Sequence, residues 1–245
     1  MNRRGFLAVA AGAILGGVAK ADDAMEAMRF SALRPGSALP GWLQPYEFPN
    51  QPRHTQFTLV EDEGRTVLRA RADAATSGLI RSLRVDARVY PVLSWRWKVM
   101  NLPAKGDLAT KAGDDFAARI YLTFDLDPAT LSLGDRVKLS LARTIWGEQL
   151  PAAALCYVWD GRAPVDTIAP NAYTDRVRMV VANSGRAELG HWVARERDIA
   201  ADFRRGFGLE PPPITGIIVS ADTDNTGETV ESYFGDIEFR ARRTS

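Results

Sequence analysis

The chain has 245 residues, of which 46% are hydrophobic and 25% are charged, an ordinary composition for a globular protein. Its 31 basic and 30 acidic residues leave a net charge of +1, and this near-neutral balance argues against nucleic acid as a partner. Cys156 is the only cysteine, which excludes a disulfide within the chain. It stands in an apolar, strand-like run, so we expect a buried structural thiol rather than a nucleophile.

The first residues carry the pattern of an export signal. Arg3 and Arg4 precede an apolar run over residues 6–18, and small residues follow at Ala19 and Ala21. This order predicts a signal peptide of the twin-arginine type over residues 1–21 and a periplasmic or secreted protein. The apolar run is too short and too rich in Gly and Ala for a membrane span, so none is expected in the mature chain. Cleavage removes three of the 31 basic residues and no acidic one, leaving a net charge of −2.

Residues 22–40 are expected to be irregular, and a single β-sandwich domain is expected over residues 41–245. Prolines recur from Pro35 onward and interrupt any regular pattern in this region. Strand signals follow over residues 54–60 and 65–72, with a turn between them, which predicts a hairpin. A third strand is expected over residues 77–85.

The clearest strand covers residues 92–100. Leu93, Trp95, Trp97 and Val99 share one face, and polar residues alternate with them. Such alternation is typical of a half-buried strand. We therefore expect the two tryptophans to anchor the core, since each buried aromatic ring covers about 150–250 Å².

The next strand is expected over residues 114–125 and has two distinct faces. The apolar face consists of Phe116, Ala118, Ile120, Leu122 and Phe124. The other face consists of Asp115, Arg119, Tyr121 and Thr123. A polar and aromatic row opposite a core row is typical of a sheet that faces a ligand, and a solvated outer face is the alternative.

Helical spacing appears in two places. Leu133, Val137, Leu141 and Ile145 predict a helix within residues 131–150. A short helix is expected over residues 198–205, with Asp198 as its N-cap. Strands are expected between and around these segments, over residues 154–160, 175–182 and 190–196.

The chain closes with two strand signals on either side of an acidic loop. Residues 217–221 and 233–239 have strand patterns, and Asp222, Asp224, Asn225 and Gly227 between them mark a turn. This predicts a closing hairpin. Many strands with only two helical stretches indicate an all-β fold, a two-sheet antiparallel sandwich of the jelly-roll kind with one or two short helical insertions.

Several motifs in this order resemble a family of exported bacterial proteins, DUF3047, a domain of unknown function. They include Trp-Arg-Trp-Lys at residues 95–98, Gly-Asp-Asp-Phe at 113–116, Tyr-Val-Trp at 157–159, the stretch 198–207, and the loop at 221–227 with Tyr-Phe-Gly-Asp-Ile at 233–237. The resemblance covers nearly the whole mature chain and implies no catalytic residues. The last strand is also weakly similar to that of carbohydrate-binding jelly rolls.

The residues expected to bind a ligand are Asp114, Asp115, Arg119, Tyr121, Asp222, Asp224 and Asn225. Asp222 and Asp224 also have oxygen ligands at a spacing that suits calcium, the one candidate metal. An Asx-rich turn, in which these side chains bond their own backbone, is the alternative. The aromatic rings of Tyr121, Trp146, Tyr157, Trp159, Tyr173 and Trp192 suit sugars, although most of them are expected in the core.

Three functions are compatible with these residues. The first is an exported protein that binds a glycan or another polar ligand. The second is a glycan hydrolase or lyase that uses the carboxylates of Asp114, Asp115, Asp222 and Asp224. The third is a structural envelope protein with a calcium-holding loop. No established catalytic motif is present, so the catalytic residues are unknown at this point.

Overall fold

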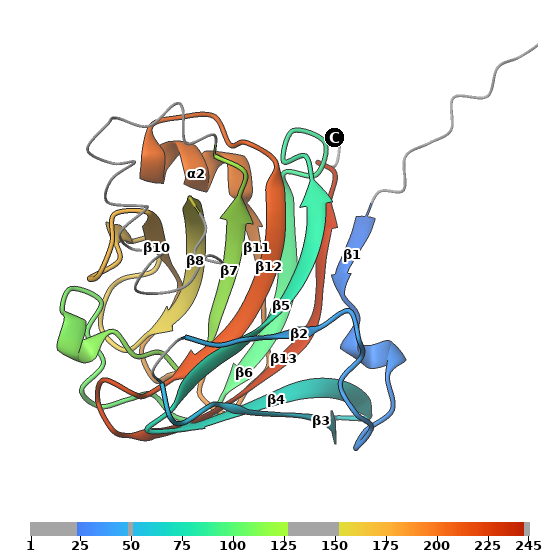
Figure 1. Ribbon diagram of the computed structural model, residues 1–245, viewed down its shortest axis with the longest axis vertical. Helices are drawn as coiled ribbons and strands as arrows, with labels where there is room; N and C mark the ends of the chain where they lie inside the picture. Colours follow the sequence, from blue (N-terminus) through green and yellow to red (C-terminus); the bar gives the residue numbers. More distant parts are fainter. Residues whose placement is uncertain (1–23, 49–50, 127–151, 243–245) are drawn as a thin grey trace, which may run out of the picture.

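The computed structural model describes residues 24–48, 51–126 and 152–242, which form two packed β-sheets (Figure 1). This confirms the predicted all-β sandwich. In spatial order, sheet A contains β11 (Val193–Asp198), β6 (Val92–Val99), β13 (Thr229–Arg240), β4 (Arg65–Asp73) and β3 (Gln56–Asp62). β1 (Ala24–Met28) also pairs with β13.

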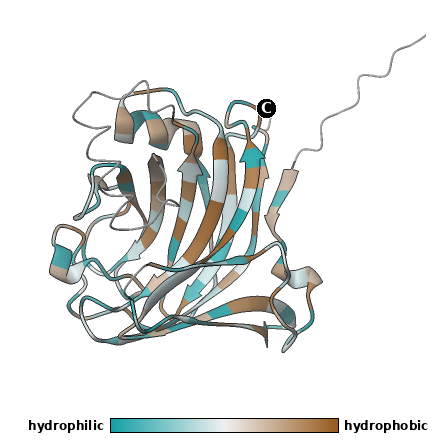
Figure 2. Cartoon of the chain, viewed as in Figure 1, coloured by the Kyte–Doolittle hydropathy of each residue, from teal (hydrophilic) through white to brown (hydrophobic). Residues whose placement is uncertain are grey.

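Sheet B forms the other layer. Its order is β2 (Gln44–Tyr46), β5 (Thr76–Val85), β12 (Ile214–Asp222), β7 (Arg119–Phe124), β8 (Ala153–Asp160), β10 (Val177–Ser184) and β9 (Ile168–Pro170). Its described pairs are antiparallel, except that β8 and β10 run parallel. β12 lies in the middle of the sheet and is buried along nearly its whole length, and Figure 2 shows how hydrophobic it is.

Aromatic rings hold the two sheets together. Trp95 and Trp97 of β6 point inward, as their alternation predicts, and are 3% and 0% exposed. The ring of Trp95 lies 5.3 Å from that of Tyr157, and the ring of Trp97 lies 6.0 Å from that of Trp159. Both partners stand on β8, so the large rings of one sheet pack directly against those of the other.

The outer face of sheet B has a second, smaller hydrophobic cluster. It consists of Leu108, Phe116, Cys156, Val158, Met179 and Val181. These residues come from β8, β10 and the loop over residues 100–118, so the loop covers this part of the sheet. β8 is therefore buried on both faces, as is usual for a strand in a parallel pair. The rest of the outer face is left for the pocket described below.

A short helix, α2 (Ile199–Phe207), lies across one end of the sandwich (Figure 1). Asp198 caps it, since its Oδ1 accepts a hydrogen bond from the Ala201 N–H at 2.9 Å. Phe203 packs against Phe124 of β7, with ring centroids 4.5 Å apart. The predicted helix and its N-cap are thus confirmed. Two 3-10 turns, η1 (Phe30–Ala32) and η2 (Lys111–Gly113), are also described.

Two predictions fall on residues outside the described ranges. The helix expected within residues 131–150 is one, and the signal peptide over residues 1–21 is the other. In the described part of the chain, no helix has the length and hydropathy that crossing a membrane requires.

The closing hairpin predicted for residues 217–239 is wrong. β12 belongs to sheet B and β13 to sheet A, so the acidic loop between them passes from one sheet to the other. At the two ends of the loop, Asp222 pairs with Thr76 of β5, whereas Thr229 pairs with Asp73 of β4. Turn residues indicate where a strand ends, but they do not decide which strand it pairs with.

The acidic loop is a corner of the sandwich and lies beside a second corner. β4 and β5 also belong to different sheets, and Ala74 and Ala75 connect them. The Ala74 N–H donates to the Glu228 carbonyl and the Thr223 N–H donates to the Ala75 carbonyl, both at 2.9 Å. These two hydrogen bonds tie the corners together and hold the acidic loop in place.

The irregular segment expected over residues 22–40 contains regular structure. β1 pairs with the end of β13, and its residues Ala27 and Met28 are fully buried. The prolines that indicated irregularity begin only at Pro35. Residues 24–28 form a strand because their backbone groups pair with those of β13, which is far away in the sequence.

The strand expected over residues 114–125 begins later, at Arg119. Phe116 does not join Ile120 and Leu122 in the core between the sheets, because it packs into the outer cluster. The backbone of Phe116 instead bonds Asp222: its carbonyl accepts from the Asp222 N–H at 3.1 Å, and its N–H donates to the Asp222 carboxylate at 2.9 Å. This reciprocal contact takes the place of a strand ladder.

Candidate functional site

A pocket of about 550 Å³ opens on the outer face of sheet B. Its floor comes from β7, β8 and β12 and includes Tyr121, Thr123, Ala154 and Ile218. Residues near the β2 edge contribute Tyr46, Phe48 and Gln51. The segment that leads into β10 contributes Asn171 and residues 173–177. One end consists of Asp114, Arg119, Asp222, Asp224 and Asn225. Polar and aromatic side chains thus both line the cavity.

Arg119 is the centre of the polar end. It is 2% exposed, and its guanidinium lies 4.5 Å from the ring centroid of Phe116. Nε and Nη2 donate to the two carboxylate oxygens of Asp222, at 2.9 and 2.6 Å. Nη1 donates to the Tyr121 hydroxyl at 3.1 Å and to Asp114 Oδ1 at 3.3 Å, and Nη2 also donates to the Asp114 carbonyl. These five contacts match the five N–H groups of a guanidinium.

Asp222 ends β12 and is held from two directions. Arg119 forms a bidentate ion pair with its carboxylate, and the Phe116 N–H donates to Oδ1 at 2.9 Å. Burial raises the pKa of Asp222 to about 8, while the charge of Arg119 acts in the opposite direction. Burial would by itself lower the pKa of Arg119, but Asp222, Tyr121 and Asp114 raise it well above its usual value. The pair is a fixed part of the pocket wall.

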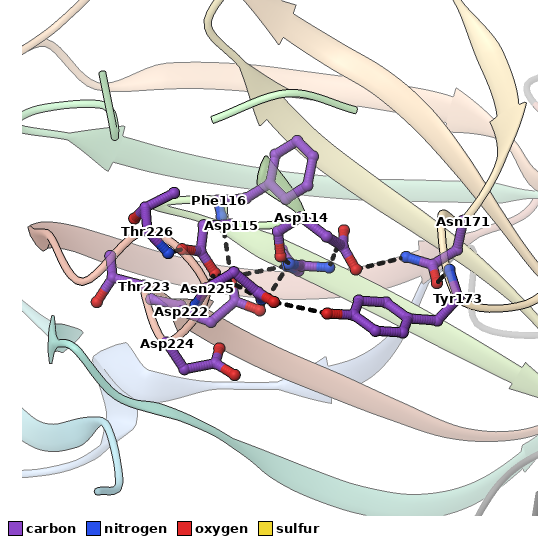
Figure 3. Close-up of polar contacts among 12 residues, drawn as sticks. Asp114, Asp115, Phe116, Asn171, Tyr173, Asp222, Thr223, Asp224, Asn225 and Thr226 are labelled. Atoms are coloured by element: carbon purple, nitrogen blue, oxygen red, sulfur yellow. Dashed lines mark hydrogen bonds and ion pairs between the residues drawn. The ribbon is translucent and has the colours of Figure 1, made fainter. Parts of the chain in front are cut away.

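Asp115 lies behind the pocket and holds the acidic loop. It is 1% exposed and does not line the cavity. Its Oδ2 accepts from the Thr226 N–H at 2.6 Å, and its Oδ1 accepts from the N–H and the side-chain amide of Asn225 at 3.3 and 3.2 Å (Figure 3). The carboxylate therefore caps backbone donors that the corner would otherwise leave unpaired.

Asp114 and Asn225 are linked to the far wall of the pocket. Asn171 donates its side-chain amide to Asp114 Oδ2 at 2.8 Å, and the Tyr173 hydroxyl donates to Asn225 Oδ1 at 2.6 Å (Figure 3). Tyr173 is 43% exposed, which leaves part of its ring open to the cavity. Tyr173 thus ties this wall to the acidic loop, about fifty residues away in the sequence, and Asn171 ties it to Asp114 in the loop over residues 100–118.

Asp224 is the most open carboxylate at this end. It is half-buried, and none of the contacts drawn in Figure 3 reaches it. Gln51 donates to its Oδ2 at 3.2 Å. Burial raises the pKa of Asp224 above the usual value, and the neighbouring charge of Asp115 adds to the effect. A ligand that donates hydrogen bonds would relieve this unfavourable environment.

Within the described ranges, Asp115, Asp222 and Asp224 form the group that could hold a metal ion. One oxygen of each lies within 4.8 Å of the others. Calcium takes six to eight oxygen ligands, and most oxygens of Asp115 and Asp222 already accept hydrogen bonds from N–H groups. An ion here would have to displace these donors, and Arg119 already supplies positive charge. The donor set therefore fits a protein-internal network better than a calcium cage.

The structure brings together all seven residues that the sequence indicated. Six of them line the pocket, and Asp115 supports the loop behind it. Sequence reasoning missed Tyr46, Phe48, Gln51 and Asn171. The first three lie in the proline-rich stretch, where no regular pattern indicates which side chains face a ligand. Asn171 has no motif around it.

The other rings that were considered for sugar binding have different places. Tyr157 and Trp159 are buried in the core, as expected for most of them, while Tyr173 lines the pocket. Trp192 lies on the outer face of sheet A, where the Arg96 guanidinium stacks 4.3 Å from its ring. Trp146 is outside the described residues. Cys156 is fully buried and burial raises its pKa to about 12, which confirms the expected burial of this thiol.

A family model described as a protein of unknown function, DUF3047, matches residues 40–238. The chain belongs to the DUF3047 family. This confirms the resemblance inferred from the motifs. No curated protein matches the sequence.

Two similar solved structures are distant likenesses. One is the family 11 carbohydrate-binding module of the cellulosomal cellulase Lic26A-Cel5E of Clostridium thermocellum, at 10% identity and a TM-score of 0.44, covering 92% of this chain and 99% of the module. Another is the cellulose induced protein Cip1, at 11% identity and a TM-score of 0.32, covering 80% of this chain and 90% of that protein. Both TM-scores are low, so the ligand of this DUF3047 chain is inferred from its pocket and not from these neighbours.

Proposed function

We propose that this DUF3047 protein binds a glycan or a similar polyhydroxylated ligand in the pocket on sheet B. The observation that carries the proposal is the composition of that single cavity. Tyrosine and phenylalanine rings stand beside carboxylates and amides in a volume of about 550 Å³. Ligand pockets commonly have volumes of about 300–1,000 Å³ and use a few placed polar groups for orientation.

The chemistry of the pocket suits a sugar. A sugar ring has apolar C–H faces and a rim of hydroxyl groups. Tyr173 offers a partly open ring on one side, and Tyr46 and Phe48 offer rings near the β2 edge. Asp224 and Asn225 lie beside them as hydrogen-bonding groups. The hydroxyl groups of a sugar would meet the acceptors, while its C–H face covers an aromatic ring.

Binding is favoured over hydrolysis because most of the carboxylates are already engaged. Glycosidases need two carboxyl groups that flank the bond to be broken. Asp222 and Asp115 are held by N–H donors, and Asp114 is held between Arg119 and Asn171. Among the carboxylates of the polar end, Asp224 remains open to a substrate. The hydrolase or lyase function stays as the second candidate, supported by the raised pKa of Asp224, which suits a general acid.

The test is a glycan array probed with the chain lacking residues 1–21, followed by calorimetry with each glycan that binds. Tyr173→Ala is expected to weaken binding about tenfold, which corresponds to about 1.4 kcal/mol. Tyr173→Phe keeps the aromatic ring and is expected to lose less affinity than Tyr173→Ala. Trp42→Ala removes an exposed ring that does not line the pocket and serves as the control. Failure to bind any glycan, or binding that Tyr173→Ala leaves unchanged, would contradict the proposal.

The same protein samples also test the two alternative functions, an enzyme and a structural protein. Release of new reducing ends or unsaturated sugars from a bound glycan would indicate an enzyme. A rise in melting temperature with calcium alone, lost in Asp224→Asn, would indicate the structural protein with a calcium-holding loop.

Export is part of the same proposal and rests on the arginine pair at residues 3 and 4. A twin-arginine signal is read by its receptor, so replacing both arginines with lysine should keep the protein in the cytoplasm. Undiminished periplasmic protein in that variant would contradict this route.

A further inference from the structure

The lining of the pocket contains more carboxylates than guanidiniums. Its lining includes the four carboxylates Asp114, Asp175, Asp222 and Asp224 and only two guanidiniums, Arg119 and Arg176. Asp115 adds a fifth carboxylate directly behind the wall. Asp114 and Asp222 are buried against Arg119, so the carboxylates that a ligand can reach are Asp175 and Asp224, and these favour positive charge.

The guanidinium of Arg119 has no N–H group left for an anionic ligand. Arg119 is 2% exposed and directs all five of its N–H groups to protein oxygens. The Arg176 side chain is 12% exposed, and its Nε lies 3.9 Å from a carboxylate oxygen of Asp175. A carboxylate or phosphate on the ligand would therefore find no free N–H group on Arg119, the guanidinium at the polar end.

Asp224 offers a place for a cation. Within the described parts of the chain, no Lys, Arg or His nitrogen lies within ion-pair distance of its carboxylate, and its side-chain partner is the neutral amide of Gln51 at 3.2 Å. The carboxylate is half-buried, so solvent screens its charge only in part. An ammonium group would offer Asp224 a charge-assisted hydrogen bond, which is stronger than one from a neutral hydroxyl.

The aromatic rings of the pocket also suit a cation. A cation is attracted to the face of an aromatic ring within about 6 Å of its centroid. Tyr173 already shows this behaviour, because the Lys111 ammonium lies 5.2 Å from its ring centroid. Phe48 and Tyr46 add further rings to the lining. A carboxylate among aromatic rings is a suitable environment for an amine.

We propose that the ligand of this pocket is an amino sugar in its ammonium form, held by Asp224, and that the pocket rejects uronic acids. This inference rests on the proposed glycan binding and adds the class of sugar. It predicts an order of affinity in which the free amine comes first, neutral forms follow, and carboxylated forms come last.

Four matched oligosaccharides test this order by calorimetry at about pH 6. All are β-1,4-linked tetramers, of glucosamine, N-acetylglucosamine, glucose and glucuronic acid, so the substituents change while the chain stays the same. We expect the glucosamine tetramer to bind at least about tenfold more tightly than the glucose and N-acetylglucosamine tetramers. The glucuronic acid tetramer should bind most weakly. High salt should reduce the differences in affinity between the charged and the neutral tetramers, because it screens the interaction between the ligand and the carboxylates of the pocket.

Asp224→Asn should remove the preference for the amine without abolishing binding of the neutral tetramers. Asp125→Asn is the matched control. Asp125 directly follows β7, whereas the pocket's polar end lies at Arg119, where β7 begins, and the half-exposed side chain of Asp125 pairs with Arg84. This variant should keep the preference for the amine. Melting curves of both variants verify that they fold. The comparison of the four tetramers uses the wild-type protein. It therefore tests the preference for the amine even if Asp224→Asn does not fold.

The outcomes distinguish the two proposals. If neutral or acidic forms bind as tightly as the amine, or if Asp224→Asn keeps the full preference, the amino-sugar inference is wrong while glycan binding stands. If only another glycan from the array binds, the same comparison is made between its free-amine, acetylated and carboxylated forms. If no glycan binds at all, both proposals fail.

Discussion

Trp97 shows how one side chain serves both packing and hydrogen bonding. It is fully buried between the sheets, and its Nε1 donates to Asn183 Oδ1 at 2.9 Å. We expect Trp97→Ala to lower the free energy of unfolding by about 3–5 kcal/mol, the usual cost of removing a buried aromatic ring. Chemical denaturation measures this loss. Trp42→Ala, at a position 37% exposed, should cost much less, and a loss below about 1 kcal/mol for Trp97→Ala would contradict its burial.

Glu231 is expected to contribute to stability in a pH-dependent way. Its hydrogen bond with Arg69 lowers its pKa below the usual value, and the Tyr233 hydroxyl donates to it as well at 2.5 Å. The unfolded chain therefore takes up the proton first as the pH falls below about 4.5. The stabilisation is present above that pH and is lost as the pH falls through the lowered pKa of the folded state.

Glu231→Gln should accordingly cost about 1 kcal/mol or less at pH 7, since the pair is partly exposed, and the cost should shrink toward zero near pH 3. Chemical denaturation at both pH values measures the difference. Arg84 and Asp125 form a more exposed pair, so Asp125→Asn is a suitable control with a smaller effect. An equal cost at both pH values would show that the charge of Glu231 is irrelevant.

At the scale of elements, the loop over residues 100–118 links the outer cluster to the pocket. Gly113 ends η2 just before Asp114 and Asp115, and its carbonyl accepts from the N–H groups of Asp107 and Asp115, both at 2.7 Å. A Cβ on Gly113 would lie 2.7 Å from the backbone nitrogen of Asp107, which is too close. The glycine thus permits the close approach that positions the two aspartates.

Gly113→Ala should therefore displace this loop. We expect a loss of about 1–3 kcal/mol in the free energy of unfolding, as for other overpacked sites, and weaker ligand binding. Gly41→Ala is the matched control, because a Cβ at Gly41 would meet no atom within 4 Å. If both variants unfold at the same denaturant concentration, the close approach at Gly113 has no energetic consequence.

The corner between β12 and β13 has a comparable role for the acidic loop. Asp115 caps the loop from behind, and the adjacent corner at Ala74 and Ala75 bonds it from the side. These contacts make the loop part of a rigid framework, so Asp224 and Asn225 face the pocket in a defined geometry. Sites held on rigid frameworks lose less entropy when a ligand binds.

At the scale of the whole molecule, β1 completes sheet A although the family match begins only at residue 40. Ala27 and Met28 are fully buried, and the Ala27 carbonyl accepts from the Arg81 guanidinium at 2.6 Å. A chain that starts at residue 29 should lose about 1.5–3 kcal/mol from the burial of Met28 alone. It would also expose the edge of β13 and tend to aggregate.

Denaturation and light scattering of chains that start at residues 22 and 29 measure this effect. A chain that starts at residue 24 is the control, because it keeps the whole of β1. Equal stability and solubility of the chains starting at 22 and 29 would mean that β1 is dispensable.

The sequence by itself determined the faces of the strands and several whole elements. Alternation placed Trp95 and Trp97 inward and Arg119 and Tyr121 outward, and capping chemistry located α2 behind Asp198. These features depend on residues within a few positions of one another, so a local pattern contains them. For the same reason, residue type and position are enough to indicate the seven candidate residues without their distances.

Only the tertiary structure decided how these parts meet. It assigned β12 and β13 to different sheets, paired β1 with β13, and brought Asn171 to Asp114 and Tyr173 to the acidic loop. It also directed every N–H of Arg119 inward, which changes this residue from an expected ligand contact into a support for its neighbours. Such outcomes depend on hydrogen-bonding partners and burial between segments far apart in the chain, and no local pattern of residue types specifies them.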